Sequence, residues 1–127
     1  MANYANQRLG QSVAVAAALA DGGRVRILHA LQEGELCVCQ LVELLGLAPS
    51  TVSRHLGQLR QAGLLEARRD GRWIHYRLAD SAASELACQA LAWCLAHAAR
   101  DPQLRDDARR LVTIRSQETG SICGPRP

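Results

Sequence analysis

Residues 40–63 read QLVELLGLAPSTVSRHLGQLRQAG, and this stretch decides the fold. Residues 40–46 predict a short helix that ends at Gly46, because glycine is the usual residue just past a helix end. A turn over residues 47–50 follows, and its proline or serine opens the next helix. We therefore expect two helices joined by a tight turn.

The second of these helices spans roughly residues 50–62 and separates apolar from polar side chains. Val52, Leu56 and Leu59 recur at three- and four-residue spacing, so they should face the protein interior. A helix fits the major groove of B-DNA, where exposed hydrogen-bonding side chains reach base edges and phosphates. The outward side of this helix carries the side chains that we expect to contact DNA in this way: Ser50, Thr51, Ser53, Arg54, His55 and Gln58.

A β-hairpin should follow, because strand-like runs over residues 64–69 and 72–78 flank an Asp-Gly dipeptide. In the second run the side chains alternate, so one face can be buried while the other faces water. At the hairpin tip, Arg69 and Arg72 are expected to contact the neighbouring minor groove or phosphates. Helix, turn, helix and hairpin in this order make up a winged helix-turn-helix.

Helical patterns outside this stretch complete a fold that is mainly α with a small β-hairpin. We expect one winged-helix domain for DNA binding and dimerisation over residues 1–100. A C-terminal extension over residues 101–127 should be partly disordered, because its end is rich in Gly, Pro and Ser. The other predicted helices occupy residues 12–20, 24–32, 81–99 and 103–115.

The charge of the chain is concentrated in one place. The 127 residues carry a net charge of +3, and every basic side chain is an arginine. Residues 50–78 contain six arginines against two acidic side chains, so this stretch holds the whole positive excess. A local basic patch is the electrostatic signature of phosphate binding.

Composition excludes several classes of protein. Apolar residues make up 48% of the chain, which is too many for a disordered protein. No run of eighteen apolar residues occurs, so we expect no membrane-spanning helix and no membrane partner. The polar start lacks the apolar block of a secretory signal. We therefore expect a cytoplasmic protein, in which the five cysteines serve as ligands or redox thiols rather than structural disulfides.

Residues 18–31 (ALADGGRVRILHAL) and residues 35–78 resemble the ArsR/SmtB family of bacterial metalloregulatory repressors. The similarity covers about residues 9–99 and is most specific in SRHLGQLRQAGLL and in the hairpin. The resemblance implies a homodimer that represses double-stranded operator DNA and leaves it when an inducer binds. It also implies that the first helix and the helix over residues 81–99 form the dimer interface.

The segment ELCVCQL resembles the arsenic-sensing signature of that family, which implies that Cys37 and Cys39 are inducer ligands. Thiolates are soft ligands that select thiophilic ions, and trivalent arsenic or antimony prefers three sulfurs in a pyramid. Val42 stands where the signature usually has its third cysteine. We favour Cys123 as the third ligand. The alternatives are Cys88 and Cys94, which suit packing in an apolar helix, or a site of two thiolates with a water or hydroxide.

The same residues also bear on other inducers and other functions. The zinc site of the family is broken, because Ala82 follows Asp80 and Arg100 follows His97 at the ligand spacings. Cadmium or lead at the cysteine pair stays open, as does a redox or persulfide switch that pairs Cys39 with a cysteine of the long helix. A constitutive DNA-binding protein with incidental cysteines is a further alternative.

An enzyme is not expected, because the chain has neither a phosphate-cradling loop nor a Cys-x-x-Cys motif. The favoured interpretation is a transcriptional repressor that trivalent arsenic (arsenite) or antimonite releases from operator DNA. Inducer binding should distort the start of the helix before the recognition helix, so that the recognition helix tilts or the spacing of the two half-sites changes.

Overall fold

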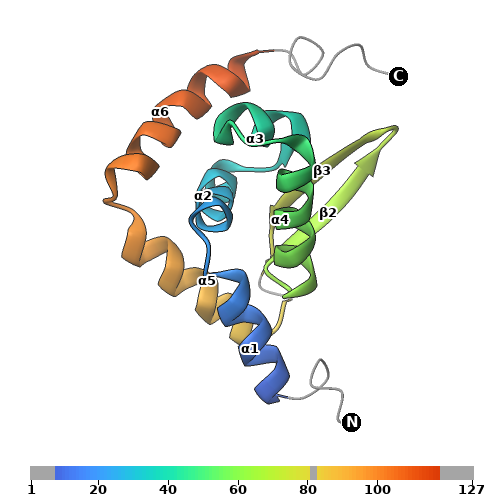
Figure 1. Cartoon of the computed structure of the whole chain (residues 1–127), viewed down its shortest axis with the longest axis vertical. Helices are drawn as coiled ribbons and strands as arrows, with labels where there is room; N and C mark the ends of the chain where they lie inside the picture. Colours follow the sequence, from blue (N-terminus) through green and yellow to red (C-terminus); the bar gives the residue numbers. More distant parts are fainter. Residues whose placement is uncertain (1–7, 81–82, 118–127) are drawn as a thin grey trace.

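The computed structural model describes residues 8–80 and 83–117, which form six α-helices, a short 3-10 helix and a three-stranded sheet (Figure 1). The helices on either side of the decisive stretch begin and end within a few residues of the predicted limits. The elements in chain order are α1 (Arg8–Ala18), α2 (Gly22–Ala30), η2 (Leu31–Glu33), β1 (Leu36–Cys37), α3 (Val38–Leu45), α4 (Pro49–Gln61), β2 (Leu65–Asp70), β3 (Trp73–Leu78), α5 (Glu85–Ala98) and α6 (Pro102–Ser116).

Local chemistry explains where the central helices begin and end. Asp21 caps α2, since its carboxylate accepts from the backbone N–H of Arg24 at 3.2 Å. Gly46 ends α3 in the left-handed conformation, with φ 67°, which glycine adopts without a steric penalty. Pro49 occupies the first turn of α4, where its missing N–H costs nothing. The predicted helix, turn and helix are thus confirmed.

The predicted hairpin is present, and the sheet contains one more strand than we expected. Strand β3 lies in the centre, with β2 on one side and β1 on the other. In β1, Leu36 is paired with Tyr76 and Cys37 with His75. Two residues are too few to produce an alternating pattern, so β1 could not be recognised in the sequence.

Aliphatic side chains fill the core between the helices and the sheet. Val52, Leu56 and Leu59 of α4 are each fully buried, as their spacing predicts. Ile27 and Leu28 of α2 and Leu41 and Leu44 of α3 meet them in one cluster. The core thus fixes α4 against α2 and α3, and the side of α4 that faces away from the core stays exposed.

Helices α5 and α6 form the left-hand side of the molecule in Figure 1, away from the hairpin. Helix α5 begins at Glu85, after the predicted start, because the hydroxyl of Ser84 caps it by accepting from the N–H of Ala87 at 3.1 Å. Helix α6 packs against α2 and α3 and buries Leu104, Leu111 and Ile114. Among the described residues, no helix is long and apolar enough to cross a membrane.

Candidate nucleic-acid interface and cysteine site

The outer side of α4 displays most of the side chains that we predicted to contact DNA. Ser50, Ser53 and Arg54 are exposed, while Thr51 is half-buried. Their shared face results from the burial of Val52 on the opposite side of the same helix. These side chains can therefore reach a partner without any rearrangement of the core.

Two of the predicted contact residues, His55 and Gln58, form hydrogen bonds with another residue of the protein. Arg24 of α2 donates to Gln58 Oε1 at 2.7 Å, and its guanidinium lies 3.2 Å from His55 Nδ1. On the other side of the ring, His55 Nε2 lies 3.6 Å from the Oδ2 atom of Asp21. The side chain of His55 is 13% exposed. The same guanidinium donates to the carbonyl of Ala18 at 2.8 Å.

Arg24 thus ties the end of α1 to α4. Sequence reasoning missed this residue. The one signal that points to it is the Asp-Gly-Gly-Arg sequence, in which the capping aspartate (Asp21) and the arginine share a helix start.

The hairpin, which forms the wing, supplies a basic surface in addition to the exposed face of α4. Arg69 and Arg72 are exposed on either side of the turn, where Gly71 adopts a positive φ of 65°. The hairpin projects away from the helices (Figure 1). Two other wing arginines are neutralised: Arg77 pairs with Glu66 at 2.8 Å, and Arg68 pairs with Glu35. The tip therefore carries the arginines that are best placed for phosphates.

The cysteine pair lies at the junction between the sheet and α3. Cys37 ends β1, caps α3 and is only 3% exposed, and its N–H donates to Gln40 Oε1 at 2.9 Å. Cys39 follows in the first turn of α3 and is half-buried, and it is disulfide-bonded, whereas the sequence led us to expect a thiol. The positive end of the helix dipole favours negative charge at such a position. The pair can start a thiolate site only after Cys39 is reduced and Cys37 leaves the core.

The other cysteines differ in their surroundings. Cys94 is buried in α5, and burial raises the pKa of its thiol. Cys88 is half-buried, and its thiol donates to the carbonyl of Asp80 at 3.5 Å. Cys123 lies outside the described residues. Within residues 8–80 and 83–117, no three His, Cys, Asp or Glu side chains are grouped as a metal site, and Val42 packs against the core.

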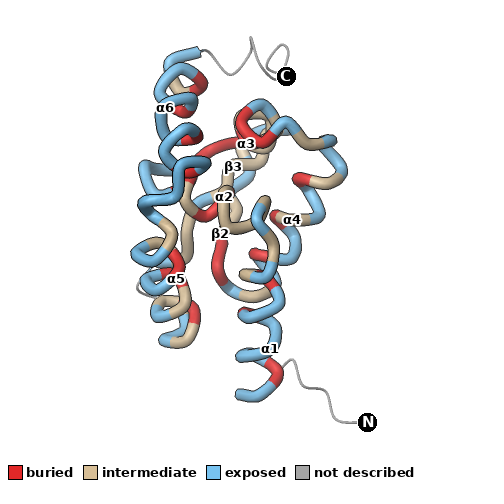
Figure 2. Tube along the Cα trace, turned by 60° about the vertical axis from the view of Figure 1, so that its left-hand side comes forward, coloured by how far each residue is buried: buried red, intermediate tan, exposed pale blue. Residues whose placement is uncertain are grey.

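Apolar side chains are exposed on α1 and α5. Leu9 is 64% exposed and Val13 is 58% exposed on α1, most of which lies at the surface (Figure 2). On α5, Trp93 is 61% exposed and stacks on His97, with ring centroids 5.7 Å apart. Large exposed apolar groups on neighbouring helices are typical of a protein interface.

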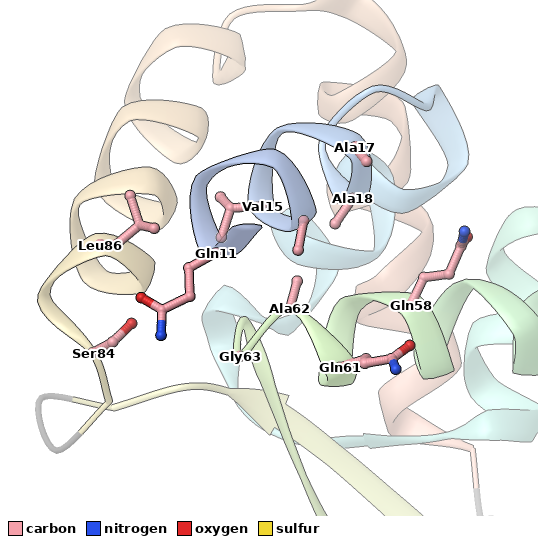
Figure 3. Close-up of a pocket in the computed structure, with 11 residues that line it drawn as sticks. Gln11, Val15, Ala17, Ala18, Gln58, Gln61, Ala62, Gly63, Ser84 and Leu86 are labelled. Carbon is pink, nitrogen blue, oxygen red and sulfur yellow. The ribbon is translucent and has the colours of Figure 1, made fainter. Parts of the chain in front are cut away.

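A cavity of about 440 Å³ lies between α1, the end of α4 and the start of α5 (Figure 3). Gln11, Gln58 and Gln61 supply polar groups to it, and alanines form much of its wall. None of its lining residues is titratable or contains sulfur. The cavity is therefore separate from the cysteine pair.

Comparison with known proteins agrees with this geometry. The family described as "Bacterial regulatory protein, arsR family" matches residues 21–67. The arsenic resistance transcriptional regulator ArsR1 of Pseudomonas putida is 54% identical over 61 residues, which are 47% of this chain and 48% of that protein. The cadmium resistance regulator CadC of Listeria innocua is 37% identical over 59 residues, which are 46% of this chain and 50% of that protein. The chain thus spans about half the length of these curated relatives.

Solved structures extend the similarity over more of the chain. One is the solution structure of the homodimeric winged helix-turn-helix DNA-binding domain of a possible ArsR-family regulator from Mycobacterium bovis. It is 33% identical with a TM-score of 0.62, and the match covers 77% of this chain and 87% of that one. The fold class predicted from the sequence is therefore confirmed.

Proposed function

This chain belongs to the ArsR family of bacterial regulatory proteins, and from that membership we propose that it is a transcriptional repressor that binds operator DNA as a homodimer. The exposed face of α4 would enter the major groove, with Arg54 nearest the bases or phosphates. Arg69 and Arg72 at the wing tip would contact the flanking backbone. The fully buried opposite side of α4 supports this assignment, because it holds the reading face in one orientation.

We further propose that the inducer is trivalent arsenic or antimony. The observation that carries this proposal is the Cys37–Cys39 pair at the start of α3, the helix that packs against the recognition helix. Soft thiolates bind thiophilic ions in preference to hard ones. Because thiols must lose protons to bind, inducer affinity should fall as the pH is lowered.

Cys123 is our candidate for the third sulfur. Helix α6 ends beside the cysteine pair, since Arg115 donates to the carbonyl of Glu35 at 3.2 Å. Cys123 lies eight positions after Arg115, and a chain of that length spans at most about 28 Å. The tail therefore starts within reach of Cys37. Cys94 is a poorer candidate, because burial raises the pKa of its thiol.

Release of DNA would follow from the position of Cys37. Cys37 is only 3% exposed, and it caps α3. An ion that binds both sulfurs must draw Cys37 out of the core, which opens the first turn of α3. Since α3 packs against α4, the distortion changes the placement of the recognition helix. Binding of the inducer then weakens binding of DNA, and the reverse, with a coupling free energy of about 1–3 kcal/mol.

Cadmium or lead is the second candidate inducer. It is favoured by the same thiolates and by the similarity to a regulator named for cadmium resistance. A redox or persulfide switch at Cys39 is a further candidate of the same kind.

A gel-shift titration of operator DNA tests these candidates. Arsenite should release the wild-type protein, while Cys37→Ser and Cys39→Ser should bind DNA normally and resist release. Cys88→Ser is the matched control and should respond like the wild type. Release of Cys37→Ser by arsenite would show that the site is wrongly assigned. Parallel titrations with antimonite, cadmium, lead, zinc and an oxidant identify the inducer.

A further inference from the structure

The segment just before the cysteine pair is held by α6 on one side. The guanidinium of Arg115 donates to three backbone carbonyls: Glu35 at 3.2 Å, Gly34 at 3.0 Å and Ala30 at 3.3 Å. Arg115 is itself half-buried, and burial lowers the pKa of its guanidinium. These bonds fix the backbone immediately before β1, so the segment cannot easily move away from α6.

The wing holds the same segment on the other side. The carboxylate of Glu35 accepts two hydrogen bonds from Arg68 of β2, one of them from Nε at 3.3 Å. This bidentate pair lowers the pKa of the Glu35 carboxyl. Two residues after Glu35, Cys37 is paired with His75 of β3 in the sheet. The backbone of a proposed inducer ligand is thus part of the wing sheet.

We propose that Glu35, Arg68 and Arg115 are positioning residues that hold the Cys37 segment between α6 and the wing, so that inducer binding displaces the wing as well as α3. This inference rests on the proposed function. With Arg115 fixing the segment on the α6 side, a shift of Cys37 is passed across the β1–β3 pairing. Trp73 lies on the same strand, two residues from His75 and next to the tip arginine Arg72.

Fluorine NMR measures the displacement directly. The chain contains two tryptophans, so protein labelled with 5-fluorotryptophan gives one resonance for Trp73 and one for Trp93, which the spectrum of Trp93→Phe assigns. Arsenite should shift the Trp73 resonance of the wild-type protein in the absence of DNA. If arsenite releases operator DNA while the Trp73 resonance stays unchanged, the wing is not displaced and the inference is overturned.

A matched pair of variants tests the Glu35–Arg68 contact. Glu35→Gln weakens the contact between the segment and the wing, whereas Glu66→Gln weakens the Glu66–Arg77 pair, which lies within the wing at similar exposure. Glu35→Gln should reduce the loss of operator affinity that arsenite causes by about two- to fivefold, the range that an exposed ion pair can supply. Its Trp73 shift should fall in parallel. Equal behaviour of the two variants would contradict the proposal.

Arg115 is tested with a charge-conserving change. Lysine retains the positive charge but cannot span three carbonyls from one nitrogen, so Arg115→Lys should also reduce the Trp73 shift. Arg109→Lys is the control, since Arg109 is exposed on α6 and contacts only Asp106 among the described residues. A full Trp73 shift in Arg115→Lys would show that Arg115 has no positioning role.

The arsenic–thiolate absorbance in the ultraviolet separates this inference from the proposed function. If the wild-type protein develops no such absorbance, the proposed inducer site fails. If all variants develop it with similar affinity, differences in Trp73 shift and in operator release report on the positioning residues alone. Thermal unfolding of each variant confirms that the compared proteins are folded.

Discussion

The arginines of this chain differ in their contacts, and therefore in what each contributes to the fold or to DNA binding. Arg24 makes four contacts within the protein: it holds Gln58 and His55 and caps the carbonyls of Ala17 and Ala18. Arg72 is exposed at the wing tip. A buried or shared guanidinium fixes the fold, whereas an exposed one is available to phosphates. The surroundings of each arginine therefore decide its contribution to DNA binding.

Replacing Arg72 with alanine should weaken operator binding. Each phosphate contact that is lost should also lower the slope of log affinity against log salt by about one unit. Fluorescence anisotropy with labelled operator at several salt concentrations measures both quantities. Arg109→Ala serves as control, because that arginine lies on α6, away from the wing. An unchanged affinity and slope for Arg72→Ala would remove the wing tip from the interface.

At the residue level, helical periodicity predicted which side chains of α4 are buried, but not which of its polar side chains are bound by other residues of the protein. Val52, Leu56 and Leu59 follow from helical periodicity alone, and all are buried. His55 has the same polar character as its neighbours, but a partner 31 residues away engages it. Such long-range pairing depends on how α2 packs against α4, which no local pattern contains.

At the scale of elements, α6 shows how a charged helix can be an integral part of a fold. Asp107 is only 3% exposed. It accepts from Arg26 of α2 at 2.8 and 3.0 Å and from Gln103 at 3.0 Å. The neighbouring Arg110 donates to the carbonyl of Leu44 at the end of α3 at 2.8 Å. Polar bonds thus dock α6 on two helices of the DNA-binding unit.

Asp107→Ala should destabilise the protein strongly. The change leaves Arg26, whose side chain is 21% exposed, without its carboxylate, and breaking such a pair costs about 3 kcal/mol. Urea unfolding measures the change in the free energy of unfolding. Asp106→Ala, one residue away and 51% exposed, should cost less than about 0.5 kcal/mol. Similar losses in both variants would show that the Arg26–Asp107 pair does not anchor α6.

The sequence identified α6 as a helix but gave no indication of where it packs. Its apolar residues Leu104, Leu111 and Ile114 fall on one side, yet α2 and α3, against which α6 packs, both end by Leu45, 57 residues before α6 begins. Strand β1 was missed for a different reason: it has two residues and depends on β3 for its hydrogen bonds. For the cysteine site, the motif indicated Cys37 and Cys39 but could not show that Cys37 is buried.

The whole molecule should lose stability in mild acid because of His29, a residue of α2 that contacts the backbone of Cys94 on α5. Burial lowers the pKa of its imidazole from the ordinary value of 6.5, although a hydrogen bond to Cys94 opposes this. The unfolded chain therefore binds the proton more readily. The stabilising effect is complete above pH 6.5 and is lost as the pH falls toward the lowered pKa.

Thermal unfolding at about pH 7.5 and pH 5.5 tests this pH dependence. The wild-type protein should lose more stability between these two conditions than His29→Gln, which cannot bind the proton. The comparison uses the difference between the two proteins, so titration of other groups cancels. Equal losses would show that protonation of His29 is not linked to unfolding.

The surface of the molecule predicts how two copies associate. Val13 of α1 and Trp93 of α5 are exposed apolar side chains on the two helices that the family resemblance assigns to the dimer. Val13→Glu should therefore yield a monomer with reduced operator affinity, because two half-sites are no longer contacted together. Light scattering after gel filtration measures the mass. Val112→Glu is the matched control, since Val112 is 73% exposed on α6 and should leave the dimer intact. A dimeric Val13→Glu protein would place the interface elsewhere.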